Sequence, residues 1–270
     1  MTSGPHDQVD EYATIADVYD LWSSDMTADV PFYVGEAVAA GGPVLEVGVG
    51  TGRIALAIAA MGVDVVGIDV SQTMLDRARR RVADDPNGAR VELVEADMRS
   101  LDLGRTFPLV ILPYRVFAHA LTTDQQVDTL RSLRDHLAPG GRLVLNVTVP
   151  HGDDLRSWDG LNFEGRYTLD DGHEAVLWRQ VEYEPATQLL TFHFVVDHLD
   201  GDGVVVRRQH GSSLVRQNVP GEVDHALARA GFAVADRWGW FDHRPFAGQA
   251  TEYVVAATRI DEWRRGTPAG

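Results

Sequence analysis

The stretch from Val44 to Ala59, which reads VLEVGVGTGRIALAIA, constrains the fold of this chain more than any other stretch. A short apolar run is followed by alternating glycines, Gly48, Gly50 and Gly52, and then by apolar residues at helical spacing. Alternating glycines let a backbone turn sharply between a strand and a helix and approach a ligand without a Cβ in the way. The stretch therefore predicts a strand, a ligand-binding turn and a helix.

The pattern of strand, turn and helix repeats along the chain as far as Pro150. Strands that are apolar almost throughout, such as VDVVGIDV and PLVILPY, alternate with helical stretches such as QTMLDRARRRV. This alternation is typical of a parallel sheet covered by helices on both faces. We predict a doubly wound, Rossmann-like α/β core over residues 43–150, preceded over residues 1–42 by a frayed tail and two short helices.

The rhythm changes after Pro150. Residues 151–215 contain alternating apolar and polar stretches separated by DDG, EPATQ and LDGDG, which is typical of antiparallel hairpins. We predict an inserted antiparallel β-meander here. A helix and two strands over residues 216–260 are expected to complete the core, and residues 261–270 to form a disordered tail.

The composition limits the classes of function. The chain has 24 Lys and Arg residues against 40 Asp and Glu residues, and its net charge of −16 argues against nucleic acid as a partner. No segment is apolar for long enough to cross a bilayer and the first residues lack a secretory signal pattern, so a cytoplasmic protein with no membrane partner is expected. Because cysteine is absent, disulfides, thiolate metal sites and cysteine nucleophiles are excluded.

Two charged residues of the opening stretch distinguish between nucleotide ligands. A dinucleotide-binding G-x-G-x-x-G pattern would have its third glycine where this chain has Arg53. The carboxylate of Glu46 is a poor neighbour for a pyrophosphate, but it suits an ammonium group attached to a nucleoside, as in S-adenosylmethionine. Asp69 and Asp97 end the next two strands, where they could accept hydrogen bonds from the ribose and from adenine, although either could also cap a helix.

Several stretches of the chain resemble, in order, the motifs of class I S-adenosylmethionine-dependent methyltransferases. They are VLEVGVGTGRIALAIA, VVGIDVSQTMLDRAR, VELVEADMRSLDL, PLVILPYRVFAHAL and LAPGGRLVLNV, and GEVDHALARAGFAV looks like the helix and strand that follow in that fold. The resemblance implies a seven-stranded sheet whose last strand, TEYVVAATRI, is antiparallel. It also implies S-adenosylmethionine as the cofactor and leaves the acceptor open.

The resemblance implies roles for individual residues. Glu46 and the loop of Gly48, Gly50 and Gly52 are expected to hold the methionine part of the cofactor. Asp69 is expected to hold the ribose, and Asp97 with the backbone of Met98 the adenine. Further cofactor contacts are expected from Tyr19, Arg53, Val70, Met74 and Leu112, with a structural salt bridge as the alternative for Arg53.

The N-terminal stretch IADVYDLWSSDMTADVPFYVGEA resembles a lid of small-molecule methyltransferases. By that similarity Tyr19 lies close to the sulfonium, where its ring and hydroxyl can stabilise positive charge, and core packing is the alternative. The acceptor is expected near Tyr33, Tyr114, Arg115 and His119. His119 is the first candidate for a base and His243 the second, whereas Arg115 could bind an acceptor carboxylate or pair with a surface acid.

The predicted insert carries aromatic residues that could form a roof over the acceptor, with ordinary packing as the alternative. They are Trp158, Phe163, Trp178, Phe192 and Phe194. In similar enzymes such an insert also pairs subunits, which allows a homodimer. No metal site is expected, because Asp97, His119, Asp242 and His243 lack the spacing of metal ligands.

The sequence therefore predicts an enzyme that transfers a methyl group to nitrogen or oxygen of a small molecule, such as a secondary metabolite. Methyl transfer is an in-line displacement, so the protein must mainly align the acceptor and exclude water. Two alternatives stay open. One is a binding or scaffold protein that holds the cofactor without turnover, and the other is a nicotinamide-dependent oxidoreductase, which the residue Arg53 opposes.

Overall fold

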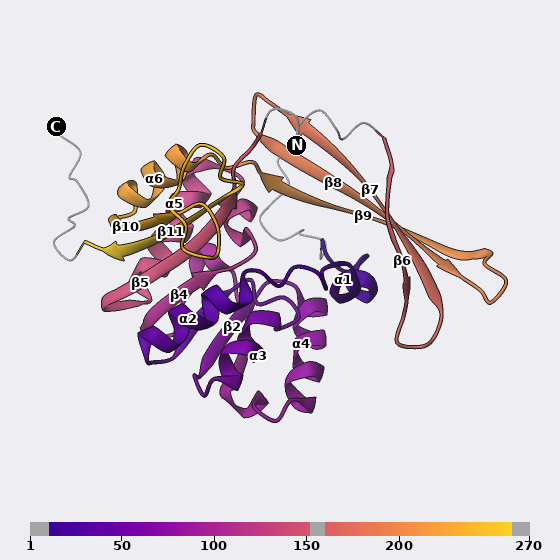
Figure 1. Ribbon diagram of the computed structural model, residues 1–270, viewed down its shortest axis with the longest axis horizontal. Coiled ribbons are helices and arrows are strands. Elements are labelled where there is room, and N and C mark those ends of the chain that lie inside the picture. The colour runs from indigo at the N-terminus through magenta and orange to yellow at the C-terminus, as the bar shows by residue number, and fades with distance from the viewer. Residues whose placement is uncertain (1–10, 152–159, 261–270) are drawn as a thin grey trace.

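A seven-stranded sheet lies at the centre of the computed structural model, which describes residues 11–151 and 160–260 (Figure 1). The strand order is β10-β11-β5-β4-β1-β2-β3, and β11 runs antiparallel to its neighbours β5 and β10. The strands are β1 (Val44–Val47), β2 (Val65–Asp69), β3 (Val91–Glu95), β4 (Phe107–Leu112), β5 (Leu137–Thr148), β10 (Phe232–Trp238) and β11 (Glu252–Arg259). The predicted doubly wound sheet with an antiparallel last strand is thus confirmed.

Helices cover both faces of this sheet. The α-helices are α1 (Ala16–Trp22), α2 (Val30–Ala40), α3 (Arg53–Ala60), α4 (Gln72–Asp84), α5 (Thr123–Asp135) and α6 (Pro220–Arg229), and short 3-10 helices are η1 (Gly88–Arg90), η2 (Met98–Ser100) and η3 (Val116–His119). Apolar side chains of α2, α3 and α4 form one core cluster with the sheet, and those of α5 and α6 form another. Local signals set the helix starts, since Ser71 caps α4 and a capping box of Thr122 and Gln125 opens α5.

The strand order reverses next to β1, which pairs with both β2 and β4. At such a point the loops after neighbouring strands leave in opposite directions and open a crevice at the carboxyl ends of the strands. The loop after β1 carries the alternating glycines, and the loop after β4 carries Tyr114 and η3. The fold therefore places these two loops on either side of a potential ligand site.

A second, antiparallel sheet stands away from the central sheet (Figure 1). It consists of β6 (Asn162–Thr168), β7 (Glu174–Glu184), β8 (Leu189–Leu199) and β9 (Val205–Arg216), paired in that order. One of its faces packs on the start of the chain, where Ile15 and Val18 join Leu177 and Phe194 in a third core cluster. The predicted β-meander is confirmed, and α1 lies between this four-stranded sheet and the core.

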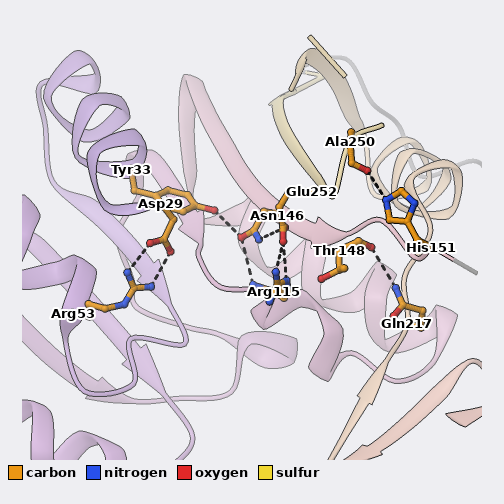
Figure 2. A network of polar contacts seen from close by, with 10 residues as sticks. All are labelled: Asp29, Tyr33, Arg53, Arg115, Asn146, Thr148, His151, Gln217, Ala250 and Glu252. Carbon is orange, nitrogen blue, oxygen red and sulfur yellow. Dashed lines mark hydrogen bonds and ion pairs between the residues drawn. The ribbon is translucent and has the colours of Figure 1, made fainter. Parts of the chain in front are cut away.

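Polar contacts near the strand ends hold the segments that connect this second sheet to the core. Gln217, just after β9, donates a hydrogen bond to the carbonyl of Thr148 at 3.3 Å, and a ring nitrogen of His151 lies 3.2 Å from the carbonyl oxygen of Ala250 (Figure 2). The predicted frayed tails and Trp158 lie outside the described residues. Among the described helices, none is long and apolar enough to cross a membrane.

Candidate functional site

A cavity of about 310 Å³ lies at the carboxyl ends of β1, β2 and β4. Its walls come from the glycine loop, the loops that follow β2, β3 and β4, the start of the chain and Leu214 of β9. Predicted site residues that line it are Tyr19, Glu46, Gly48, Gly50, Arg53, Asp69, Val70, Met74, Asp97, Met98, Tyr114 and His119. The structure therefore brings together most of the residues that the motifs indicated.

Glu46 is the buried acid of this cavity. Strand β1 is buried along its whole length, so the side chain of Glu46 is only 2% exposed. Its Oε2 atom has no hydrogen-bond partner among the described residues, and burial raises the pKa of the carboxyl well above its usual range. A buried carboxyl oxygen without a hydrogen-bond partner destabilises the folded protein unless a ligand supplies that partner. A cationic group of a ligand bound in the cavity would supply it.

The glycine loop brings backbone close to the cavity. Gly48 has a φ of 69°, and a Cβ built on it would lie 2.4 Å from a methyl carbon of Val116, so a side chain does not fit there. The amide of Gly50 donates to Oδ2 of Asp69 at 2.9 Å, which ties the loop to the end of β2. The loop and Asp69 are thus held as one unit.

The two strand-end aspartates differ in their partners. Oδ1 of Asp69 accepts from the amide of Ser71 at 2.9 Å, so Asp69 is bonded on both oxygens by backbone. Asp97 accepts from the backbone amide and the guanidinium of Arg99. Burial alone would raise the pKa of Asp97, but the hydrogen bonds from Arg99 outweigh it and hold this pKa below its ordinary value. Asp97 therefore stays ionised where the cavity needs an acceptor.

Arg53 forms the structural salt bridge that the sequence left as an alternative. Its guanidinium donates to both carboxylate oxygens of Asp29, at 2.6 and 2.8 Å (Figure 2). It also donates to the carbonyl of Met26 at 2.9 Å. The pair joins the start of α3 to the connection between α1 and α2. Arg53 thus fixes the N-terminal segment against the glycine loop.

His119 and Tyr12 meet at the wall of the cavity. The Tyr12 hydroxyl is hydrogen-bonded to Nε2 of His119 at 3.1 Å, and Nδ1 lies 3.8 Å from a carboxylate oxygen of Glu11. Burial lowers the pKa of His119 to about 4, so the imidazole is neutral at neutral pH and has a nitrogen lone pair. The ring of Tyr19 packs edge-on against Tyr12, with centroids 5.8 Å apart.

Sequence reasoning missed Glu11 and Tyr12, although both line the cavity. They lie just before the lid motif, where the helical pattern gave no reason to single them out. Glu11 accepts a hydrogen bond from Ser213 of β9 at 2.8 Å, so the second sheet helps to hold it. The available signal was an acidic and an aromatic residue side by side at the start of the predicted lid.

Other predicted residues lie outside the cavity wall. The hydroxyl of Tyr33, a fully buried residue, donates to Asn146 at 3.0 Å, which does not place it beside an acceptor (Figure 2). Arg115 pairs with the buried acid Glu252, where the sequence suggested an acceptor carboxylate or a surface acid. His243 is half exposed and packs on the rings of Phe32 and Trp238.

Some residues that we predicted to contact the cofactor or the acceptor have a backbone or packing role in the structure. Leu112 is buried in the core cluster beneath the sheet, and Gly52 is the N-cap of α3 with a φ of 85°. None of the described aromatic residues that we predicted as a roof lines the cavity, since only Leu214 represents the second sheet in its wall. Within residues 11–151 and 160–260, no group of three or more His, Asp or Glu side chains could hold a metal ion.

The site fits one class of enzyme. A buried unpartnered carboxyl suits the ammonium of an amino acid, carboxyl groups at the strand ends suit a nucleoside, and a glycine loop on a seven-stranded sheet brings them together. These features, with the antiparallel last strand, define a class I S-adenosylmethionine-dependent methyltransferase. S-adenosylmethionine is its cofactor, and when bound it supplies an electrophilic methyl group on sulfur.

Comparisons with known proteins agree with this assignment. A family model described as a methyltransferase domain matches residues 44–141. The solved structure of the CcbJ methyltransferase from Streptomyces caelestis is 31% identical, covers 94% of this chain and 99% of that chain, and superposes with a TM-score of 0.79. The chain therefore belongs to the class I S-adenosylmethionine-dependent methyltransferases.

Two curated relatives match shorter regions. The cypemycin N-terminal methyltransferase of a Streptomyces species is 33% identical over 152 residues, which is 53% of this chain and 60% of that protein. The dTDP-3-amino-3,4,6-trideoxy-alpha-D-glucopyranose N,N-dimethyltransferase of Streptomyces venezuelae is 31% identical over 137 residues, which is 48% of this chain and 55% of that protein. The matches thus span little more than half the length of these relatives.

Proposed function

We propose that this protein transfers a methyl group from S-adenosylmethionine to the nitrogen of a small-molecule amine in the biosynthesis of a natural product. The observation that carries the proposal is the neutral His119, hydrogen-bonded to Tyr12 at the wall of the same cavity that Glu46 lines. Two similar proteins are named for methyl transfer to an amino group, one on a peptide N-terminus and one on an amino sugar. Both kinds of acceptor present an amine nitrogen.

The cofactor end of the cavity would bind S-adenosylmethionine through the residues already described. Glu46 would receive the ammonium group and Asp69 the ribose hydroxyls, while Asp97 and the backbone of Met98 would contact adenine. Val70 and Met74 supply apolar contacts at the same wall. Pairing with an ammonium would favour the charged form of Glu46 and give its Oε2 atom a hydrogen-bond donor.

The acceptor end contains aromatic rings and one weak base. The pKa of His119 is about 4, whereas an alkylammonium such as that of lysine has a pKa of about 10.4. Moving a proton from such an ammonium to His119 would cost about 9 kcal/mol, so His119 does not deprotonate an ammonium acceptor. We infer that the amine enters in its neutral form.

His119 then has an orienting role. In the tautomer where Nε2–H donates to the Tyr12 hydroxyl, Nδ1 keeps the lone pair. It accepts a hydrogen bond from the amine N–H, which turns the lone pair of the amine toward the cofactor methyl. The hydroxyl of Tyr12 fixes the imidazole, and burial raises the pKa of Tyr12, so this hydroxyl remains protonated. After transfer, the product leaves as the methylated ammonium and exchanges its proton with bulk water.

The experiment compares His119→Ala and Tyr12→Phe with wild type, following S-adenosylhomocysteine release with a panel of small primary amines. We expect kcat to fall about 100-fold in His119→Ala and less in Tyr12→Phe, because alignment is lost while the Kd for S-adenosylmethionine stays within about twofold. A wild-type kcat in His119→Ala would assign this histidine to structure alone.

A further inference from the structure

The turn between β4 and η3 has an unusual backbone. Tyr114 and Arg115 both have positive φ, 54° and 64°, and the amide of Val116 donates to the carbonyl of Pro113 at 3.3 Å to close the turn. Consecutive positive φ values are typical of turns built from Gly, Asn or Asp, because a longer side chain is strained there. Strain of this kind persists only where the surroundings hold it in place.

A buried polar network holds this turn in place (Figure 2). Oδ1 of Asn146 accepts from the backbone amide of Arg115 at 3.4 Å and from the hydroxyl of Tyr33 at 3.0 Å. The amide group of Asn146 donates to Oε2 of Glu252 at 2.9 Å, and the Arg115 guanidinium donates to Oε1 of the same carboxylate. Asn146 and Glu252 are each 1% exposed, so water has little access to the bond between them.

The network comes from two neighbouring strands. Asn146 lies near the end of β5 and Glu252 at the start of β11, and these strands pair with Asn146 opposite Val254. The sheet therefore fixes both polar groups on which the turn packs. The position of the turn then depends on the sheet and not on the loop sequence alone.

The turn carries the acceptor end of the cavity. The side chains of Tyr114, Val116 and His119 line the cavity, whereas Arg115 points to Glu252. The ring centre of Tyr114 lies 5.7 Å from the guanidinium carbon of Arg115 and 5.9 Å from that of Arg53. Each of these arginines is held by a carboxylate from another part of the chain, Glu252 for Arg115 and Asp29 for Arg53 (Figure 2).

We propose that Glu252 and Asn146 are positioning residues for methyl transfer, which hold the turn at Tyr114 and Arg115 so that Tyr114 and His119 face the acceptor. Neither residue lines the cavity, so their effect is transmitted through Arg115 and the backbone of the turn. Positive φ at Tyr114 turns its ring toward the cavity while the next side chain points into the network. This inference rests on the proposed amine methylation only where kcat is measured, because that measurement needs an amine acceptor.

The test compares Glu252→Gln with a matched control, Asp197→Asn. Asp197 in β8 is also a buried carboxylate that pairs with an exposed arginine, Arg208, and accepts one further hydrogen bond, from Trp178. It does not line the cavity. Both substitutions remove the negative charge from an ion pair with a buried carboxylate. A general loss of stability should therefore be similar in the two variants.

The first measurement follows the imidazole of His119 by NMR during a pH titration and needs no acceptor. Wild type and Asp197→Asn are expected to titrate this imidazole near the same low pKa of about 4. In Glu252→Gln the loosened turn should admit water, so the pKa should rise by about one unit or more toward the free value of about 6.5. Tyr12 and Glu11 face this imidazole and are unchanged in both variants.

The second measurement is kinetic. We expect kcat of Glu252→Gln to fall more than about tenfold with saturating substrates, while the Kd for S-adenosylmethionine stays within about twofold, because misplacement affects alignment more than binding. Asp197→Asn should keep the wild-type kcat. If Glu252→Gln does not fold, Asn146→Ala, which keeps the Arg115–Glu252 pair, serves in its place.

The two proposals fail in different ways. If His119 of the folded variant titrates as in wild type, the positioning role of the network is overturned, whatever the acceptor is. If no amine is methylated by wild type but the His119 titration shifts in Glu252→Gln, the amine proposal fails and the positioning role of the network is supported.

Discussion

At the scale of single residues, Glu46 distinguishes this site from an ordinary strand end. It is buried in the first strand of the sheet with one carboxyl oxygen unpartnered among the described residues. Burial raises its pKa, so the folded protein without cofactor retains a proton that the unfolded chain releases above a pH of about 4.3. The stability of the cofactor-free protein therefore falls as the pH rises from about 4.3 toward the raised pKa.

Glu46→Gln removes this pH dependence and the negative charge that we propose pairs with the cofactor ammonium. We expect the cofactor-free variant to melt at a higher temperature than wild type at neutral pH, because Gln has no buried proton to lose. The Kd for S-adenosylmethionine should rise more than about tenfold, because a hydrogen bond to a charged group is lost. Thermal melts across pH and calorimetric titration measure both, and an unchanged Kd would remove Glu46 from the cofactor site.

Residues that follow strands could be predicted from the sequence, whereas residues brought in by distant packing could not. Asp69, Asp97 and Met98 line the cavity because a parallel sheet places strand ends along one edge. Tyr12 reaches His119 across 107 positions of sequence, and no local pattern encodes that contact. His243 has a φ of 61° in a loop, a conformation that sequence spacing does not reveal, and it lies outside the cavity wall.

At the scale of elements, α1 is fixed by the core and not by its own sequence. It has seven residues and no side-chain cap, so an isolated helix of this length would not be stable. Thr51 of the glycine loop donates to Asp20 of α1 at 2.5 Å, and Arg81 of α4 donates to both at 3.1 and 3.0 Å. These bonds join the helix that carries Tyr19 to the loop that carries the cofactor residues.

Asp20→Asn should weaken this attachment and with it cofactor binding. Because the Asp20–Arg81 pair is partly exposed, we expect only a modest increase in the Kd for S-adenosylmethionine, about threefold to fivefold. The difference in Kd between variant and wild type should become smaller at high salt, because salt screens the ion pair of the wild type. Glu92→Gln, which removes the exposed Glu92–Arg105 pair whose residues do not line the cavity, is the control. Equal Kd values for Asp20→Asn and wild type at low salt would show that α1 does not retain the cofactor.

At the scale of the whole molecule, the cavity joins three parts of the chain. The central sheet, the start of the chain and β9 of the second sheet all contribute to its wall. The alternation of apolar strands and helices was sufficient to predict the central sheet, and turn residues were sufficient to predict the hairpins. The placement of the second sheet could not be predicted, because it depends on contacts such as those of Ile15 and Val18 with Leu177.

Cofactor binding should therefore stabilise the folded chain. A ligand present at 100 times its Kd adds about 2.7 kcal/mol to the free energy of unfolding, which for a chain of this size raises Tm by about 5 to 10 °C. Differential scanning calorimetry with and without S-adenosylmethionine measures the shift. The same cofactor concentration should raise the Tm of Glu46→Gln much less, and an equal shift in both proteins would contradict the assigned role of Glu46.

The central claim is methyl transfer to an amine nitrogen, and one competition measures it directly. The full chain is incubated with S-adenosylmethionine and with pairs of small molecules that differ only in an amino or a hydroxyl group, and the products are identified by mass spectrometry. Our account predicts methylated amines, no methylated hydroxyl analogues, and a much slower reaction in His119→Ala. Methylation at oxygen, or bound cofactor with no turnover on any amine, would contradict it.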